Sequence, residues 1–214
     1  MEPSHRDGSA AHLRVRGLEC RRGDRSLFSG LAFAVRSGEL VWVRGANGQG
    51  KTTLLRTLAG LSAPESGEIA WADTPTLRSF LYLAHANALK EDLTVDESLR
   101  FLLDLAGEPA TGTELDAALG RFGLGSRRRA PVRTLSQGQR RRVALARLAV
   151  PSPPLTWLLD EPFDALDASG IDVLNALLVE HARRGGSVLL TSHVPLAIVD
   201  PAPVIVQLES PVAA

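Results

Sequence analysis

The chain has 214 residues with 24 basic and 24 acidic side chains, so its formal net charge is zero. This balance excludes a global electrostatic field that would recruit nucleic acid or an anionic membrane. The single cysteine, Cys20, excludes an internal disulfide framework and a cysteine-based metal site, and we expect it to be a small buried thiol.

The amino terminus and the apolar runs do not have the pattern of a membrane-spanning protein. Residues 1–11 are polar and lack the apolar stretch of a signal peptide, so we expect a disordered tail there. No apolar run approaches the ~20 residues that are needed to cross a bilayer. We therefore expect a cytoplasmic protein whose role at a membrane would be that of a peripheral subunit.

The first expected elements lead into and out of a glycine-rich loop. Residues 13–18 alternate in the manner of a half-exposed strand, and residues 31–35 predict a second strand that pairs nearby. Residues 40–43 predict a buried strand that runs into the loop, and leucines at helical spacing predict a helix over residues 52–61.

The middle of the chain has a helical pattern from about residue 92 to residue 148. Thr94 and Glu97 fit a capping box that begins a helix, and residues 115–122 and 137–148 supply two more helical stretches. We expect a helical insertion over about residues 86–148.

Strand character returns at residues 155–159, and further short apolar strands are expected at residues 188–190 and 204–206. The helix between them should end at Gly185-Gly186. One face of that helix carries Leu174, Leu177, Leu178 and His181. Helices that alternate with buried strands predict an α/β fold with a parallel sheet.

The glycine-rich loop has the composition of a phosphate-binding site. Backbone N–H groups reach phosphate oxygens only where side chains do not block them, which explains the glycines at positions 45, 48 and 50. Lys51 would reach the terminal phosphates, and the Thr52 hydroxyl would ligate magnesium. The alternative is a glycine-rich turn without a ligand. The expected nucleotide-binding residues here are Gly45, Ala46, Asn47, Gly48, Gln49, Gly50, Lys51, Thr52 and Thr53.

Asp160 and Glu161 follow a hydrophobic strand, at the sheet edge where ligands bind in open α/β folds. Asp160 would hold magnesium, and Glu161 would act as the general base for the attacking water. Alternatively, the two acids could mark the amino terminus of a helix.

Residues Ser136-Gln137-Gly138-Gln139 satisfy the capping-box rule and predict a well-capped helix. A polar, glycine-containing turn that opens an arginine-rich helix also suits a lid over a nucleotide held by another copy of the chain. The run Arg140-Arg141-Arg142 could be read as a nucleic-acid patch, but we expect a solvated helix face with internal ion pairs.

His193 follows the strand expected near residues 188–192, at the edge that would hold the phosphates. A lone histidine is more often structural. Its place in the chain favours a contact to the terminal phosphate, which an imidazole can sense through a hydrogen bond. We expect Glu161, His193 and Lys51 to be the catalytic residues.

With these motifs in this order, the chain resembles the ATP-binding subunits of ABC transporters over nearly all of residues 13–208. The resemblance rests on Walker A at residues 45–52, the signature at 135–139, Walker B at 155–160 with Glu161, the D-loop at 165–167 and the switch histidine His193.

The resemblance implies one ABC-type P-loop NTPase domain over residues 12–214 that binds ATP and Mg²⁺. Its RecA-like core would span about residues 12–85 and 149–214, with an N-terminal antiparallel β portion and an inserted α-helical subdomain at 86–148. It also implies a head-to-tail homodimer, in which Ser136, Gly138 and Gln139 of one subunit complete the site of the other.

Two positions depart from the family pattern. Arg22 stands where the family usually stacks an aromatic side chain on adenine, and an arginine can still lie flat on a base. His85 stands near the position of the Q-loop glutamine, where it would be a weak ligand to magnesium or its water.

Residues 83–85, 93–99 and 158–167 are similar to one subfamily, the CcmA ATPases of cytochrome c biogenesis. That resemblance implies a CcmB-like integral-membrane permease, heme-handling subunits and a place on the cytoplasmic face of the inner membrane. The alternatives are an ATPase of another ABC importer or exporter, a soluble ABC ATPase, and a module that binds ATP without hydrolysing it.

Overall fold

A computed structural model describes residues 11–72, 80–153 and 155–209 of the chain. Most of the tail expected over residues 1–11 lies outside the described residues, and Ala11 already begins the first strand. No helix in the described part of the chain is long and apolar enough to cross a membrane.

Three strands form an antiparallel sheet: β1 (Ala11–Arg22), β2 (Arg25–Arg36) and β4 (Ser66–Trp71), in the order β2-β1-β4. A tight turn at Gly23-Asp24 joins β1 to β2, and Gly23 has a left-handed φ of 60° that suits a hairpin. Cys20 is 1% exposed in this sheet, so the expected buried thiol is confirmed.

Five parallel strands form the second sheet, in the order β5-β6-β7-β3-β8. Their bounds are β3 (Leu40–Arg44), β5 (Phe80–Leu83), β6 (Thr156–Leu159), β7 (Ser187–Thr191) and β8 (Val204–Gln207). The parallel sheet expected from the alternation of helices and strands is confirmed. Its strands end at one edge, which places the residues that follow them close together.

The parallel sheet separates two hydrophobic cores because successive side chains of a strand point to opposite faces. Leu158 and Leu189 belong to the core shared with the antiparallel sheet and with helix α1 (Lys51–Leu58). Leu159 and Leu190, one residue further along each strand, belong to the other core, which they share with the remaining helices.

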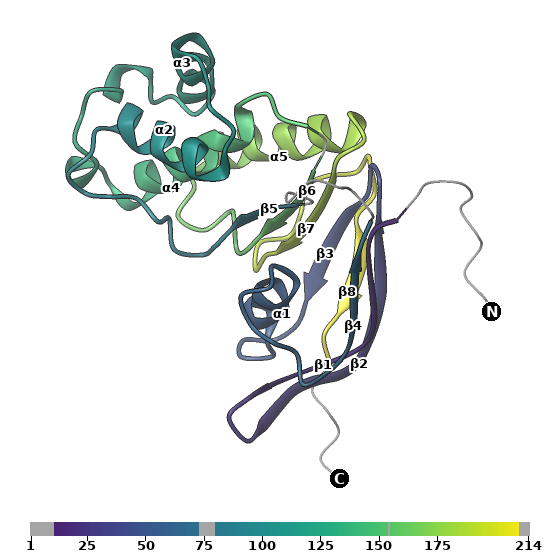
Figure 1. Cartoon of the computed structure of the whole chain (residues 1–214). Helices are drawn as coiled ribbons and strands as arrows, with labels where there is room; N and C mark the ends of the chain where they lie inside the picture. The colour runs from purple at the N-terminus through teal and green to yellow at the C-terminus, as the bar shows by residue number, and fades with distance from the viewer. Residues whose placement is uncertain (1–10, 73–79, 154, 210–214) are drawn as a thin grey trace.

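The second core contains side chains from α2 (Val95–Ala106), α3 (Gly112–Arg121), α4 (Gln137–Ala146) and α5 (Ala168–Arg183). Three short 3₁₀ turns accompany them at Gly125–Arg127, Val132–Thr134 and Arg147–Ala149. Figure 1 shows α2, α3 and α4 gathered at one end of the molecule, away from the antiparallel sheet. We call α2, α3 and α4 the helical block.

Helices α2, α3 and α4 each begin with a capping box, at Thr94, Thr111 and Ser136. Each box satisfies backbone donors that the first helical turn leaves unpaired, and this fixes where each helix starts. The capping boxes expected at Thr94 and Ser136 are therefore confirmed.

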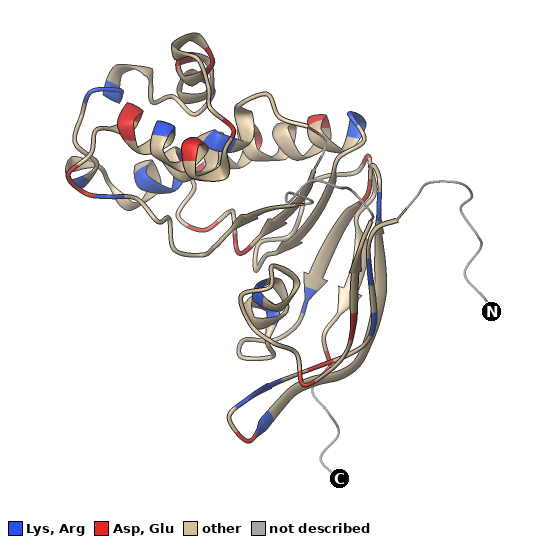
Figure 2. Cartoon of the chain, viewed as in Figure 1, with Lys and Arg blue, Asp and Glu red and all other residues tan. Residues whose placement is uncertain are grey.

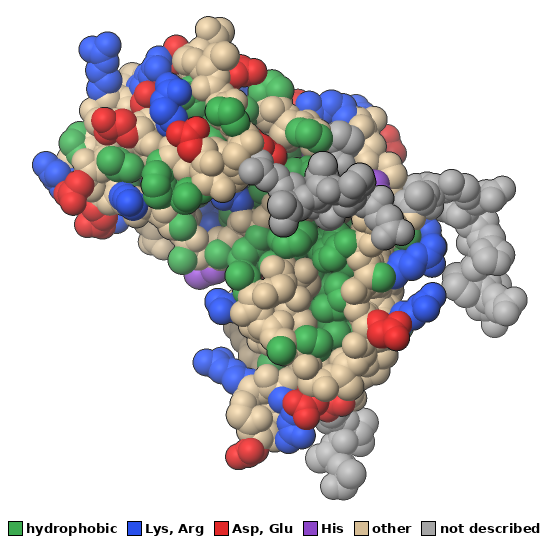
Figure 3. Space-filling model, in the orientation of Figure 1, with side chains coloured by type: hydrophobic (Ala, Val, Ile, Leu, Met, Phe, Trp, Pro, Cys, Tyr) green, Lys and Arg blue, Asp and Glu red, His purple; other side chains and the backbone are tan. Residues whose placement is uncertain are grey.

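Charged side chains of both signs are interspersed over the helical block rather than sorted by sign (Figure 2). Arg128 contacts both Asp96 and Asp116, and Arg140 pairs with Glu91. In the space-filling view, hydrophobic side chains reach the surface between the helical block and the sheets (Figure 3).

A buried histidine lies where α5 packs on the parallel sheet. The ring of His181 stacks on Trp157 with a centroid distance of 3.7 Å, and its Nε2 lies 2.7 Å from the carbonyl oxygen of Leu155. Burial lowers the pKa of His181 to about 4, because a charged imidazole would lose its hydration there.

The neutral state of His181 makes stability depend on pH. In the unfolded chain the histidine protonates near pH ~6.5, so above that pH the ring is neutral in both states and the contribution of His181 to the free energy of unfolding is complete. As the pH falls toward 4, only the unfolded chain takes up the proton, and this contribution is lost. At pH 5 we expect the free energy of unfolding to have lost about 2 kcal/mol from this residue. Urea unfolding of wild type and of His181→Phe at pH 7 and pH 5 measures it. The variant should lose less stability on acidification, and equal losses in the two proteins would contradict the assignment.

Candidate functional site

The glycine-rich loop joins β3 to α1 at the carboxyl edge of the parallel sheet. Gly50 caps α1 with a φ of +95°, and a Cβ added to it would lie 3.0 Å from the Leu27 side chain. Only glycine fits both the backbone conformation and the space. The backbone therefore turns into the helix with its first N–H groups accessible, which is the geometry of an anion site.

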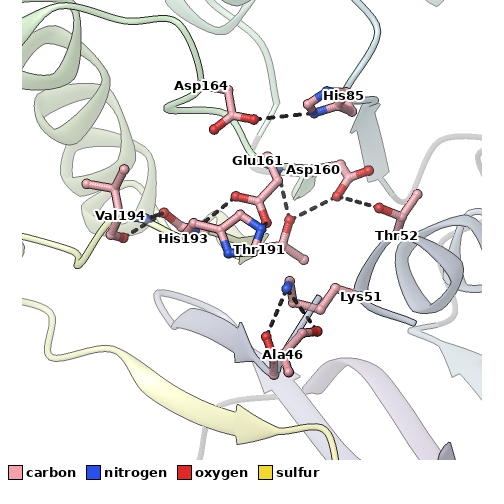
Figure 4. Close-up of polar contacts among 12 residues, drawn as sticks. Ala46, Lys51, Thr52, His85, Asp160, Glu161, Asp164, Thr191, His193 and Val194 are labelled. Carbon is pink, nitrogen blue, oxygen red and sulfur yellow. Dashed lines mark hydrogen bonds and ion pairs between the residues drawn. The ribbon is translucent and has the colours of Figure 1, made fainter. Parts of the chain in front are cut away.

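Lys51 follows this turn and is buried. Its Nζ donates to the carbonyl oxygen of Gly45 at 2.9 Å and lies 3.5 Å from that of Ala46 (Figure 4). The side chain of Gln49 accepts a hydrogen bond from the Ala46 N–H across the same loop. The ammonium group is thus held inside the loop, where it can contact an anion bound by the loop's N–H groups.

Asp160 lies directly after β6 and is fully buried. Its Oδ1 accepts hydrogen bonds from the hydroxyls of Thr52, at 3.2 Å, and Thr191, at 2.9 Å. Its Oδ2 is buried and has no hydrogen-bond partner in the protein. An unpartnered carboxylate oxygen beside a threonine hydroxyl suits a hard cation such as Mg²⁺, which prefers oxygen ligands. These residues fit the expected metal.

Glu161 is held in a left-handed backbone conformation, with a φ of 45°. Its Oε2 accepts the backbone N–H of His193 at 2.9 Å, and Nε2 of His193 lies 3.2 Å from Oε1 (Figure 4). Burial raises the pKa of Glu161, while His193 and Lys51 oppose that rise. A carboxylate with a raised pKa accepts a proton more readily, as a general base must.

Lys51, Thr52 and Glu161 line one pocket of about 430 Å³, a volume that suits a small ligand. Most of its wall comes from residues expected to bind nucleotide or act on it. The lining residues are Arg22, Leu27, Asn47, Gly48, Gly50, Lys51, Thr52, Thr53, His85, Glu161, Asp164 and His193.

Arg22 and His85, the two departures from the family pattern, both line this pocket. Nδ1 of His85 lies 3.5 Å from Oδ2 of Asp164, and both side chains are partly exposed (Figure 4). The contact found for His85 is therefore with Asp164 rather than with Thr52 or Asp160. Its weak role toward magnesium and the role of Arg22 toward adenine stay predictions.

Ser136, Gly138 and Gln139 lie at the start of α4 and are not among the residues that line this pocket. The side chain of Ser136 accepts from the N–H of Gln139, and the Gln139 side chain accepts from the Ser136 N–H. A Cβ added to Gly138 would lie 2.6 Å from the carbonyl oxygen of Ala165. Glycine is therefore required here for packing within the chain itself.

The expectation that Arg140, Arg141 and Arg142 form a solvated face is wrong for Arg141. Arg141 is 2% exposed, and its guanidinium points into the protein toward Asp160 and Glu161. Arg140 pairs with Glu91, as expected of a solvated face. Arg142 contacts Asp167 and donates to the Ser169 hydroxyl at 2.8 Å.

Sequence reasoning also missed Thr191 and Asp164. Thr191 ends β7, where a polar residue after an apolar run indicates the carboxyl edge of the sheet, as it does for His193 two residues later. Asp164 lies in a loop after Glu161, and no periodic pattern in the sequence places its side chain in the pocket.

The ABC transporter family matches residues 28–164 of the chain. Two relatives named cytochrome c biogenesis ATP-binding export protein CcmA are each 46% identical to it. The protein from Nitrosomonas europaea matches over 193 residues, covering 87% of this chain and 90% of its own. The protein from Methylococcus capsulatus matches over 192 residues, covering 86% and 92%. A solved structure of a putative ABC transporter ATP-binding protein from Pyrococcus furiosus has a TM-score of 0.78 at 28% identity, covering 92% of this chain and 96% of its own.

Thr191 offers a test of the buried network that holds the site. Its hydroxyl accepts the N–H of Glu161 at 2.9 Å and donates to Asp160. Thr191→Val keeps the shape but leaves these partners unsatisfied, so the free energy of unfolding should fall by about 1–3 kcal/mol. Thr191→Ser keeps the hydroxyl and is the matched control. Denaturant titration measures both variants, and a valine variant as stable as the serine variant would contradict the network.

Proposed function

Because this chain belongs to the ABC transporter family, we propose that it is the ATP-hydrolysing subunit of a membrane complex for cytochrome c biogenesis. The observation that carries the proposal is the pocket in which Lys51, Thr52, Glu161 and His193 meet. The chain is 46% identical to two CcmA proteins along nearly their whole length, and this supports cytochrome c biogenesis as the process that it serves.

The loop amides and Lys51 would bind the phosphates of ATP, with the positive end of α1 directed at the same oxygens. Thr52 and Asp160 would hold Mg²⁺, which supplies charge neutralisation at the phosphates. Gly45, Ala46, Asn47, Gly48, Gln49, Gly50 and Thr53 complete the nucleotide-binding residues of this proposal.

Glu161 would orient the attacking water and accept its proton as the new bond to the γ-phosphorus forms. The bond from that phosphorus to the bridging oxygen breaks, and ADP leaves with the electron pair. His193, whose backbone holds the Glu161 carboxylate, would donate a hydrogen bond from its half-exposed ring to the terminal phosphate. One hydrogen-bonded unit thus handles both the water and the phosphate.

We propose that the site is completed by a second copy of the chain. Ser136, Gly138 and Gln139 lie at a capped helix terminus outside the pocket of their own protomer. Such a terminus favours an anion, so it would cover the phosphates of a partner's nucleotide. Loss of the γ-phosphate would remove the shared contacts and let the dimer open.

The membrane partner of this proposal is a CcmB-like permease, together with subunits that handle heme. The chain would sit at the cytoplasmic face of the inner membrane as a peripheral subunit. The helical block, and the loop of residues 85–91 that leads to it, would pass the opening motion to the permease. Its work would be the release of a heme-loaded chaperone.

Glu161→Gln tests the catalytic proposal. The variant keeps the size of the side chain and one acceptor oxygen for the His193 N–H, but it cannot take a proton. We therefore expect kcat to fall by about 10²–10⁴-fold while ATP affinity is retained. Light scattering should show a dimer trapped by ATP. In the native host, the variant should fail to restore c-type cytochromes to a strain that lacks the gene.

Glu180→Gln is the matched control, because Glu180 pairs with Arg121 on the surface of the helices. It should hydrolyse ATP and restore c-type cytochromes as wild type does. Normal turnover by Glu161→Gln would refute its role as base. Normal c-type cytochromes in the deletion strain would refute the pathway and leave the ATPase assignment intact.

Mixed dimers test whether the lid acts across subunits. Lys51→Ala disables the phosphate loop and Ser136→Arg disables the lid, so each variant alone should be inactive. Because a mixed dimer contains one complete shared site, an equal mixture should recover roughly a quarter of wild-type activity if sites act independently. Absence of recovery would mean that the lid serves its own chain. Thr111→Arg, which destroys the capping box of α3 instead, should leave turnover unchanged.

A further inference from the structure

Arg141 of α4 directs its guanidinium at the backbone that carries the catalytic acids. Its Nη2 donates to the carbonyl oxygens of Asp160, at 3.0 Å, and Glu161, at 2.7 Å. Its Nε lies 3.4 Å from the carbonyl oxygen of Pro162. Three successive peptide groups are therefore held by one side chain that is 2% exposed.

The other end of the same guanidinium reaches the loop that follows β5. Its Nη1 contacts the carbonyl oxygens of Ala84 and His85, at 3.1 and 3.2 Å, and Oδ1 of Asn87 at 3.1 Å. A guanidinium has five N–H groups in a rigid planar fork, and all of them have acceptors here. Lysine cannot reproduce this pattern, because its ammonium is a single point with three donors.

Glu161 needs such a restraint because its backbone lies in the left-handed region, at a φ of 45°. For a residue with a long side chain this conformation costs about 1–3 kcal/mol and persists only where neighbouring groups fix it. Thr191 holds the N–H of Glu161 at 2.9 Å, and Arg141 holds its carbonyl oxygen. The two contacts determine the direction of the carboxylate, which then meets His193.

Three acidic side chains lie around the buried guanidinium of Arg141. Burial lowers the pKa of its guanidinium, and the nearby carboxylates of Asp164, Asp160 and Glu161 oppose that decrease. The five N–H groups donate to backbone and amide oxygens, and none of them donates to a carboxylate. The guanidinium therefore holds peptide groups in place rather than pairing directly with a carboxylate.

We propose that Arg141 is a positioning residue for Glu161, and that it fastens the signature helix to both the catalytic strand end and the His85 loop. This inference rests on the proposed ATP hydrolysis for its kinetic readout. Because α4 also carries the lid of residues 136–139, any movement of the lid is transmitted to Glu161 of the same chain. The lid that closes one site and the base that serves the other would then move together.

The test compares Arg141→Lys with Arg140→Lys in the full chain. The chemical change is the same at adjacent positions of one helix. The guanidinium of Arg140, however, contacts Glu91 and the carbonyl oxygens of Arg133 and Leu135, and none of residues 160–162. For Arg141→Lys we expect kcat to fall about 10–100-fold, with the affinity for ATP within about 3-fold of wild type. Arg140→Lys should stay within about 2-fold of wild type in both measurements.

A double-mutant cycle separates positioning from a general loss of structure. In the Glu161→Gln background, Arg141→Lys should cause no further loss of single-turnover rate, because the group that it positions is already gone. A loss that multiplies with that of Glu161→Gln would overturn the inference. So would a kcat for Arg141→Lys within 2-fold of the Arg140→Lys control.

A measurement that needs no turnover distinguishes failure of this inference from failure of the proposed function. Amide hydrogen exchange over residues 160–164 should accelerate at least 10-fold in Arg141→Lys and remain unchanged in Arg140→Lys. Equal exchange in the two variants overturns the inference whether or not wild type hydrolyses ATP. If Arg141→Lys does not fold, Arg141→Gln takes its place in all three measurements. Unlike lysine, glutamine places no charge in this buried position.

Discussion

The buried carboxylate of Asp160 is the constraint on which the rest of the site depends. A fully buried charge is costly unless hydrogen bonds replace its lost hydration. Here the hydroxyls come from Thr52 in the first turn of α1 and from Thr191 at the end of β7, while the N–H of Asp160 donates to Leu83 of β5 at 2.9 Å. One residue thus joins the phosphate loop to three neighbouring strand ends, and any ligand of its remaining oxygen acts on all of them.

Much of this arrangement could be predicted from the sequence because the signals are local. The strands at residues 40–43 and 155–159, the capping boxes at Thr94 and Ser136, and the pocket residues from Asn47 to Thr53 follow from patterns within a few residues of each other. The position of Arg141 could not be predicted in this way. Three consecutive arginines at the start of a helix carry no sign of which one faces inward, and only the tertiary structure supplies the carbonyl oxygens that Arg141 satisfies.

The start of α4 has two roles that a sequence pattern cannot separate. Gly138 lies against Ala165 so closely that a methyl group would overlap its carbonyl oxygen, and Arg142 binds the loop of Asp167 just beyond. The turn proposed to cover a partner's nucleotide is therefore packed against the loop that follows the catalytic acid in its own chain. Binding and packing requirements therefore both act on the same short segment, so a substitution at Gly138 would disturb the packing as well as the proposed lid.

The alternation of side chains in β6 determines what an inserted or deleted residue would do to the structure. Leu158 lies in one hydrophobic core, while Trp157 and Leu159 lie in the other. An insertion or deletion of a single amino acid within this strand would exchange the residues of the two cores and bring a different side chain to the position of Asp160. At a connection such as the hairpin at Gly23-Asp24, an added residue shifts neither core nor carboxylate, so we expect an insertion to be tolerated better there.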